Sequence, residues 1–136
     1  MELSQQDYEL IERAKLTYKK LYLKDVHEVA AAVRTASGDI FTGIHIEADV
    51  GFADVCGEVS AICVMVSAGH RDLQSVIAVS DDSNDELEIW APCGRCREVI
   101  KDFNPDAWVI VGTMKEPYKV TVSELLPLHS KMPEVN

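Results

Sequence analysis

The stretch Ile89-Trp90-Ala91-Pro92-Cys93-Gly94-Arg95-Cys96-Arg97 (IWAPCGRCR) joins an apolar run to a helical pattern. The run ELEIWAP, residues 86–92, predicts a strand, and GRCREVIKDF, residues 94–103, predicts a helix. Cys93 and Cys96 lie three residues apart at the start of this helix. Alone, the pair fits a redox dithiol, a structural zinc clamp or half of a catalytic metal site.

The segments on either side of this stretch predict further strands and helices. In chain order they are a helix over 5–23 capped by Ser4, a β-hairpin of 27–35 and 39–47, an apolar helix over 56–69, a strand over 73–82, the strand and helix just described, a strand over 107–113, and a short last helix that starts with a Thr121–Glu124 capping box and stops at Pro127. This order favours an α/β fold in which helices pack on the faces of a mixed sheet. The helix over 56–69 has so little polar surface that we expect burial on most sides, under the sheet or at a subunit contact.

Length and composition limit the classes of protein. A chain of 136 residues with 47% hydrophobic residues predicts one folded domain over 1–136. A net charge of −10 disfavours nucleic acid as a partner, because the surface should repel phosphates. No run reaches the roughly 18 apolar residues of a membrane span, and the polar N-terminal helix lacks a signal core. We therefore expect a cytoplasmic protein with reduced cysteines and no membrane partner.

A second cysteine motif, Cys56-Gly57-Glu58, begins the earlier apolar helix. Three thiols from two helix starts could therefore converge above the sheet, where helix N-termini favour thiolates. A zinc ion held by three protein ligands keeps a fourth position for water, as catalytic zinc sites do. Zinc deaminases combine such a site with a glutamate that is not a ligand and with a P-C-x-x-C segment.

With these residues the chain resembles the cytidine deaminase family, including its blasticidin S deaminase relatives, over residues 27–127. The matching segments are VAAAV (29–33), GIHIE (43–47), CGE (56–58), PCGRCR (92–97) and LLP (125–127). The resemblance implies a three-layer α/β/α sandwich that forms a homotetramer or, in some members, a homodimer. It also implies one Zn²⁺ per subunit held by Cys56, Cys93 and Cys96, with Glu58 as the catalytic acid and base.

Two positions bear on the substrate. His45 and Glu47 stand where cytidine deaminases have the Asn and Glu that hold the ribose. We expect both to contact substrate, with an exposed strand surface as the alternative. Arg95, inside PCGRC as in blasticidin S deaminases, is the candidate that partly neutralises the three thiolates from outside the ligand set, and Arg97 is the second choice.

Simpler readings of the cysteines explain less. A thioredoxin-type dithiol at Cys93 and Cys96 leaves the Cys56-Gly57-Glu58 motif unexplained. A closed four-cysteine site would need Cys63, which lies seven residues after Cys56 and so about 10 Å further along the helix axis. Glu58 could instead be an acid that stabilises the first turn of its helix.

The predicted function is zinc-dependent hydrolysis of a small cytosine nucleoside, cytidine or deoxycytidine, to uridine or deoxyuridine and ammonia. Deamination of blasticidin S is the alternative, because the cationic guanidino group of that nucleoside would suit an acidic chain. A zinc-binding module of the same fold without catalytic activity is the second alternative.

Overall fold

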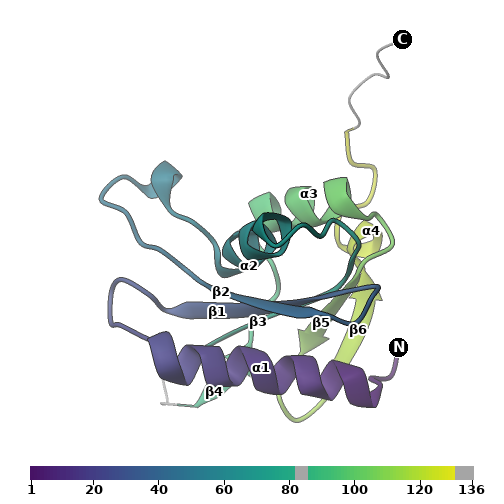
Figure 1. Ribbon diagram of the computed structural model, residues 1–136, viewed down its shortest axis with the longest axis horizontal. Coiled ribbons are helices and arrows are strands. Elements are labelled where there is room, and N and C mark those ends of the chain that lie inside the picture. The colour runs from purple at the N-terminus through teal and green to yellow at the C-terminus, as the bar shows by residue number, and fades with distance from the viewer. Residues whose placement is uncertain (82–85, 131–136) are drawn as a thin grey trace.

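A mixed sheet forms the middle layer of the protein, whose computed structural model describes residues 1–81 and 86–130 (Figure 1). Within these residues the sheet has the strand order β2-β1-β3-β5-β6, and β4 also pairs with β3. Neighbouring strands are antiparallel except β3 and β5, which are parallel. The strands are β1 (Val29–Thr35), β2 (Ile40–Ile44), β3 (Leu73–Asp81), β4 (Leu87–Ile89), β5 (Trp108–Gly112) and β6 (Pro117–Thr121).

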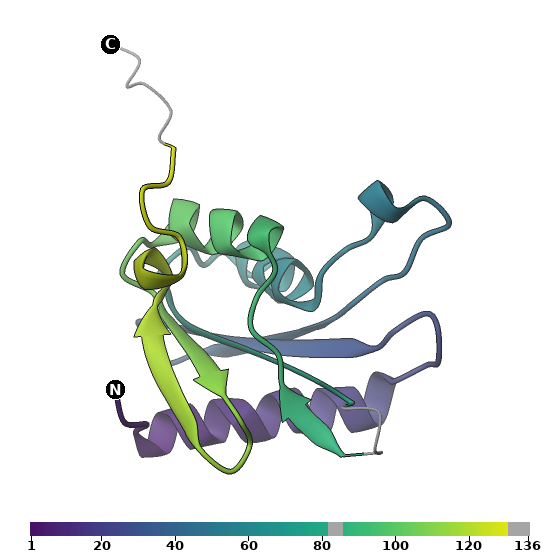
Figure 2. The same cartoon turned by 180° about the vertical axis from the view of Figure 1, so that it is seen from behind.

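Helices cover both faces of the sheet, which gives three layers. Helix α1 (Gln5–Leu21) lies on one face, and α2 (Gly57–Ser67) and α3 (Gly94–Phe103) lie on the other (Figures 1 and 2). The short α4 (Val122–Leu125) lies beside α3, and a 3-10 turn (Gly51–Ala53) sits in the projecting loop between β2 and α2. The predicted α/β/α sandwich with a mixed sheet is confirmed.

The central strands are buried on both faces, which explains their continuous apolar sequence. In β1, Ala31 and Val33 belong to the core under α2 and α3, whereas Ala30 and Ala32 belong to the core under α1. Successive side chains of a strand point to opposite faces, so the run of alanines and valine serves two cores. Position 43 of β2 requires glycine because a Cβ there would overlap the backbone of Ser60 and Ala61 in α2.

Most predicted elements are confirmed, with corrections at their ends. Ser4 caps α1 through the backbone N–H of Asp7, and the Thr121–Glu124 capping box starts α4. The strand predicted over 86–92 is shorter: β4 ends at Ile89, and after a last bond from the Trp90 N–H to Ala78 the chain leaves β3 to reach α3. Strand β6 was not predicted, and residue 82 of the predicted strand 73–82 lies outside the described residues.

Candidate active site

The N-termini of α2 and α3 bring three cysteines together on one face of the sheet. Cys56 is the residue before α2, Cys93 is the residue before α3, and Cys96 lies in the first turn of α3. The Sγ atoms of Cys56 and Cys93 are 3.4 Å apart, and those of Cys93 and Cys96 are 3.6 Å apart. All three sulfur atoms lie within 4.8 Å of one another, as the two sequence motifs predict.

These distances fit a tetrahedral metal ion. Thiolates at about 2.3 Å from Zn²⁺ in tetrahedral geometry would be about 3.8 Å from one another, close to the distances in this group. Cys63 is not part of the group, because it is exposed on α2. The cluster therefore has three thiols, and a fourth ligand position could face the adjoining pocket.

Glu58 lies beside the thiols in the first turn of α2, and 4% of its surface is exposed. Its Oε2 accepts a hydrogen bond from the Cys96 thiol at 3.1 Å. Gly57 lets the start of α2 lie close to β1, because a Cβ there would lie 2.9 Å from the carbonyl oxygen of Val29. Among the described residues Glu58 forms no ion pair. Burial raises the pKa of Glu58, and the Cys96 thiol opposes that shift only in part.

The three thiols differ in how readily they ionise. Burial raises the pKa of Cys56 and of Cys96, and the negative charge of Glu58 adds to the effect at Cys96. Burial also acts on Cys93, but hydrogen bonds with the Cys96 backbone and with the other two thiols outweigh it and lower the pKa. Three thiolates beside a carboxylate would repel one another, so the full set of ligands calls for a cation among them.

A pocket of about 180 Å³ opens next to the cysteines and Glu58. It is lined by Val29, His45, Cys56, Gly57, Glu58, Trp90, Ala91 and Cys93. Val29, Trp90 and Ala91 supply apolar surface, so the pocket combines apolar walls with the reactive groups, as small-molecule sites do. Trp90 and Val29 were not predicted as site residues, and the only signal for Trp90 was its place three residues before Cys93.

The structure brings Glu47 into contact with His45, which lines this pocket. His45 lines the pocket directly after β2, and its Nε2 lies 2.9 Å from Oε2 of Glu47. The Glu47 side chain is half-exposed. His45 thus faces the pocket, and Glu47 lies next to it.

The two candidate arginines bind backbone carbonyls. Arg95 donates to the carbonyl oxygens of Asp54 at 2.6 Å and Phe52 at 3.3 Å, so its guanidinium holds the loop that leads into Cys56. Arg97 donates to the carbonyl oxygens of Pro92 at 2.8 Å and Leu125 at 2.9 Å. Arg97 therefore ties the turn before Cys93 to α4.

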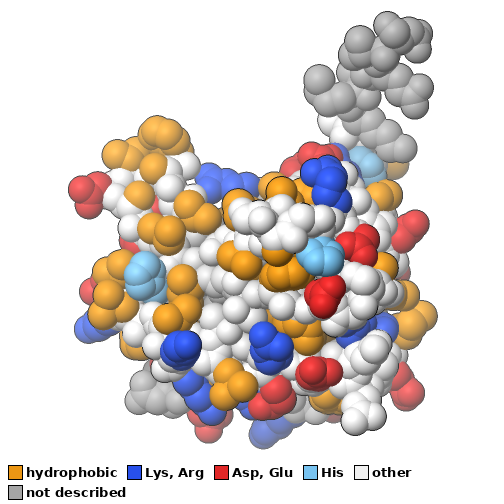
Figure 3. Space-filling model, viewed as in Figure 1, with side chains coloured by type: hydrophobic (Ala, Val, Ile, Leu, Met, Phe, Trp, Pro, Cys, Tyr) orange, Lys and Arg blue, Asp and Glu red, His pale blue; other side chains and the backbone are white. Residues whose placement is uncertain are grey.

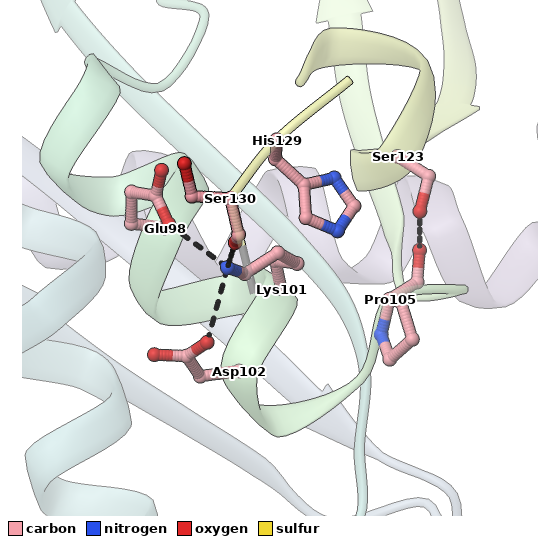
Figure 4. A pocket seen from close by; sticks show the side chains of 7 residues that line it. All are labelled: Glu98, Lys101, Asp102, Pro105, Ser123, His129 and Ser130. Atoms are coloured by element: carbon pink, nitrogen blue, oxygen red, sulfur yellow. Dashed lines mark hydrogen bonds and ion pairs between the residues drawn. The ribbon is translucent and has the colours of Figure 1, made fainter. Parts of the chain in front are cut away.

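A larger hollow of about 600 Å³ lies away from the cysteines, between α3 and the chain after α4 (Figure 4). Its charged groups largely satisfy one another: Lys101 contacts Glu98 at 3.0 Å, Asp102 at 3.3 Å and the carbonyl oxygen of Ser130 at 3.3 Å. The His129 ring contacts the carbonyl oxygen of Leu126 at 2.9 Å. Of these two pockets, the smaller one contains the groups suited to catalysis.

Comparison with known proteins agrees with this geometry. The family model described as the cytidine and deoxycytidylate deaminase zinc-binding region matches residues 4–112. The chain belongs to this deaminase family. The resemblance stated from the two cysteine motifs is therefore confirmed.

Similar proteins within the deaminase family include two kinds of enzyme. The chain is 41% identical over 130 residues to the Blasticidin-S deaminase of Bacillus cereus, with 93% of each chain covered. It is 33% identical over 101 residues to the Cytidine deaminase of Sporosarcina psychrophila, covering 73% of this chain and 71% of that one. The family thus supports a hydrolytic deaminase, and the relatives differ in substrate.

Solved structures of deaminases share the fold. The crystal structure of cytidine deaminase from Burkholderia pseudomallei superposes with a TM-score of 0.76 at 27% identity, covering 93% of this chain and 98% of that chain. The cytidine deaminase from Bacillus anthracis has a TM-score of 0.77 at 22% identity, covering 90% and 88%. At that identity the second comparison shows the shared fold alone.

Proposed function

We propose that the protein is a zinc-dependent hydrolase that converts a cytosine nucleoside, cytidine or deoxycytidine, to the uracil nucleoside and ammonia. The observation that carries the proposal is Glu58, a buried carboxylate with no cationic partner among the described residues, next to three clustered thiols at the base of a small pocket. An uncompensated buried carboxylate destabilises a protein, and such groups are characteristic of sites that transfer protons.

Cys56, Cys93 and Cys96 would hold the metal ion as thiolates. Their sulfur spacing fits the ion, and their repulsion in its absence gives a physical reason for binding it. When bound, Zn²⁺ supplies a nucleophile at neutral pH, because it lowers the pKa of bound water to about 7. Arg95 would support this centre by fixing residues 52–54 just before Cys56 and by adding a positive charge near the thiolates.

Glu58 would carry protons between water and the base. Its carboxylate accepts a proton from the attacking water and donates it to N3 of the cytosine ring, which makes C4 more electrophilic. Glu58 would then take the second proton of the added water from the new C4 hydroxyl group and donate it to the C4 amino group. The C4–N bond breaks, ammonia leaves, and a C4 carbonyl group remains. Burial raises the pKa of Glu58, which favours uptake of a proton by its carboxylate.

The walls of the pocket would exclude water and hold the base. Val29, Trp90 and Ala91 form apolar surface beside the catalytic groups, so a flat ring can replace water there. His45 and Glu47 would then lie at the sugar end of the nucleoside. In this arrangement Glu58 would reach the base, and Glu47 would reach the sugar hydroxyl groups.

Blasticidin S is the second candidate substrate, and one observation favours it. The identity of 41% over 93% of both chains is to a protein named for that activity. Glu47 lies close to the Asp54 carboxylate, so the same end of the pocket could also bind a cationic substituent.

The surface supports a homo-oligomer, which we propose to be a homotetramer with a homodimer as the alternative. Figure 3 shows hydrophobic side chains gathered on the loop between β2 and α2. This loop and the outer face of α2 carry exposed apolar residues: Ile46, Val50, Phe52, Val64 and Val66. Phe52 is 82% exposed, and a patch of this kind is typical of protein contacts.

We also propose a cytoplasmic location, because three clustered thiols must stay reduced to bind a metal ion. Among the described residues, no helix combines the length and the apolar character that crossing a membrane demands.

The experiment that tests the function is ammonia release by zinc-loaded protein from cytidine, deoxycytidine and blasticidin S, with the Glu58→Gln variant as the blank. Release from cytidine or deoxycytidine would support the proposal, and release from blasticidin S alone would select the second substrate. A full complement of zinc without release from any of the three would instead indicate a non-catalytic module of the same fold.

A further inference from the structure

Both ring nitrogens of His45 are occupied by protein partners. The backbone N–H of Glu28 donates to Nδ1 at 3.1 Å, and Nε2 lies 2.9 Å from Oε2 of Glu47. A backbone N–H can only donate, so Nδ1 must be the acceptor and the proton of the neutral ring must be on Nε2. His45 therefore donates to Glu47 and has no ring nitrogen left for a ligand.

The backbone around His45 holds the ring in this orientation. The N–H of His45 donates to the carbonyl oxygen of Val29 at 2.8 Å, and its own carbonyl oxygen lies 2.8 Å from Nδ1 of His27. The carbonyl oxygen of Glu28 accepts a bond of 2.6 Å from the buried Ser80 hydroxyl. Glu28, whose N–H bonds Nδ1, is thus tied to β3 through its own carbonyl oxygen, and the imidazole has a rigid support.

The Glu47 carboxylate needs a hydrogen-bond donor because the Asp54 carboxylate lies beside it. The ligand atoms of His45, Glu47 and Asp54 lie within 4.8 Å of one another, so two carboxylates are close together. Asp54 already accepts from the Ala48 N–H at 2.7 Å. Among the residues that the structure describes, His45 is the one side chain bonded to the Glu47 carboxylate. Without that bond, repulsion would turn the half-exposed Glu47 side chain toward solvent.

We propose that His45 is a positioning residue, which holds the Glu47 carboxylate toward the sugar of the nucleoside and does not itself bind the substrate. The inference rests on the proposed function, because it assigns the sugar end of that same site. One Glu47 oxygen is engaged by His45, and the other is directed to a sugar hydroxyl. Specificity for the sugar is then a property of the pair and not of two independent contacts.

The test compares four proteins: the wild type, His45→Phe, Glu47→Gln and the double variant, each zinc-loaded. Cytidine and 2′,3′-dideoxycytidine are the substrates, since the second lacks both hydroxyls. For cytidine we expect each single variant to raise KM about 10-fold, the loss of one charge-assisted hydrogen bond, with kcat within about twofold. The double variant should match Glu47→Gln, and His45→Phe should affect KM much less for 2′,3′-dideoxycytidine than for cytidine. KM effects that multiply in the double variant, or that are equal for both substrates, would overturn the proposal.

Two further variants guard against misfolding as the cause. His45→Gln can place an amide N–H near the Nε2 position and should recover most of the KM for cytidine. His45→Asn places its amide near the Nδ1 position and should not recover it. Equal recovery by both variants would contradict a role that depends on the bond from Nε2 to Glu47.

A measurement independent of turnover separates this inference from the proposed function. Nitrogen-15 NMR of zinc-loaded wild type should show the His45 proton on Nε2, and Glu47→Gln should shift that nitrogen. A proton on Nδ1, or no response to Glu47→Gln, would overturn the positioning role even if the enzyme is active. Failure of the wild type to deaminate any cytosine nucleoside, with the NMR result as expected, would count against the proposed function alone.

Discussion

Two buried carboxylates lie on opposite faces of the sheet, and their surroundings differ. Asp7, on the α1 side, is fully buried and contacts Lys119 at 2.8 Å and Arg34 at 3.5 Å. Burial tends to raise the pKa of Asp7, but hydrogen bonds from Lys119 and Ser4 outweigh it, so the pKa is lowered. Asp7 therefore stays charged and joins α1 to β1 and β6.

Glu58, on the side of α2 and α3, has no such compensation. It is nearly as buried as Asp7, but its side-chain partner is the Cys96 thiol, and burial raises its pKa. The comparison shows that burial alone does not decide the role of a carboxylate. Cations beside Asp7 make a permanent charge that stabilises the fold, whereas their absence beside Glu58 leaves a group that can exchange protons.

The largest effect expected from this difference is on turnover. Glu58→Gln should lower kcat by about 10⁴-fold, the upper range for a general acid and base, while zinc content stays at the wild-type level. The free energy of unfolding should not fall, because the variant removes a buried charge that lacks a cationic partner. Ammonia release and thermal unfolding measure the two quantities.

Glu98→Gln, a matched change at a half-exposed site on α3, is the control and should alter neither turnover nor stability. Substantial turnover by Glu58→Gln would show that the two carboxylates do not differ as described.

Asp7→Asn should show the reverse pattern. Loss of the carboxylate leaves Lys119 and Arg34 without their buried partner, so the free energy of unfolding should fall by about 3 kcal/mol. Turnover per folded molecule should stay unchanged, because Asp7 lies on the opposite face from the cysteines. Urea denaturation followed by circular dichroism measures the loss. A variant as stable as the wild type would mean that the ion pairs contribute little.

Asp7 should make the folded protein less stable as the pH falls into the acid range. Its pKa is lower in the folded protein than in the unfolded chain, so the unfolded chain takes up a proton first as the pH falls. The contribution of Asp7 is complete above its unfolded pKa of about 3.9 and is lost as the pH falls through the lower folded value. The stability difference between wild type and Asp7→Asn should therefore shrink in acid. A difference that is constant over this range would contradict the assignment.

The smallest effect is expected at Cys63. It is exposed on α2 and lies outside the group of three thiols, so Cys63→Ser should retain full zinc content and turnover and change stability by less than about 0.5 kcal/mol. Cys93→Ser is the matched comparison within the cluster and should lose zinc affinity. Metal analysis after dialysis distinguishes the two. Loss of zinc from Cys63→Ser would revive the closed four-cysteine site.

The two carboxylates also show what could be predicted from the sequence. Glu58 was identifiable because its neighbours in the chain, Cys56 and the PCGRC segment, carry the chemical signal, and each motif sits at a predictable helix start. The pairing of Asp7 with Lys119 spans 112 residues and includes β6, which was not predicted. Local patterns do not encode contacts of that separation, so the role of Asp7 could only come from the structure.

Side-chain directions were the other quantity that the sequence could not supply. Arg95 was predicted beside the thiolates, and the structure adds that its guanidinium bonds the carbonyl oxygens of Asp54 and Phe52. His45 and Glu47 were predicted as two substrate contacts, and their mutual bond became visible only with coordinates. In both cases the residue position follows from a motif, but its partner depends on how the loop after β2 folds.

The most direct test of the central claim measures zinc content and ammonia release on the same preparations of wild type and Glu58→Gln, with cytidine and blasticidin S offered in turn. The account predicts one zinc ion per chain in both proteins and ammonia from the wild type only. Equal release by the two proteins, or wild type that binds zinc and releases no ammonia from either nucleoside, would contradict it.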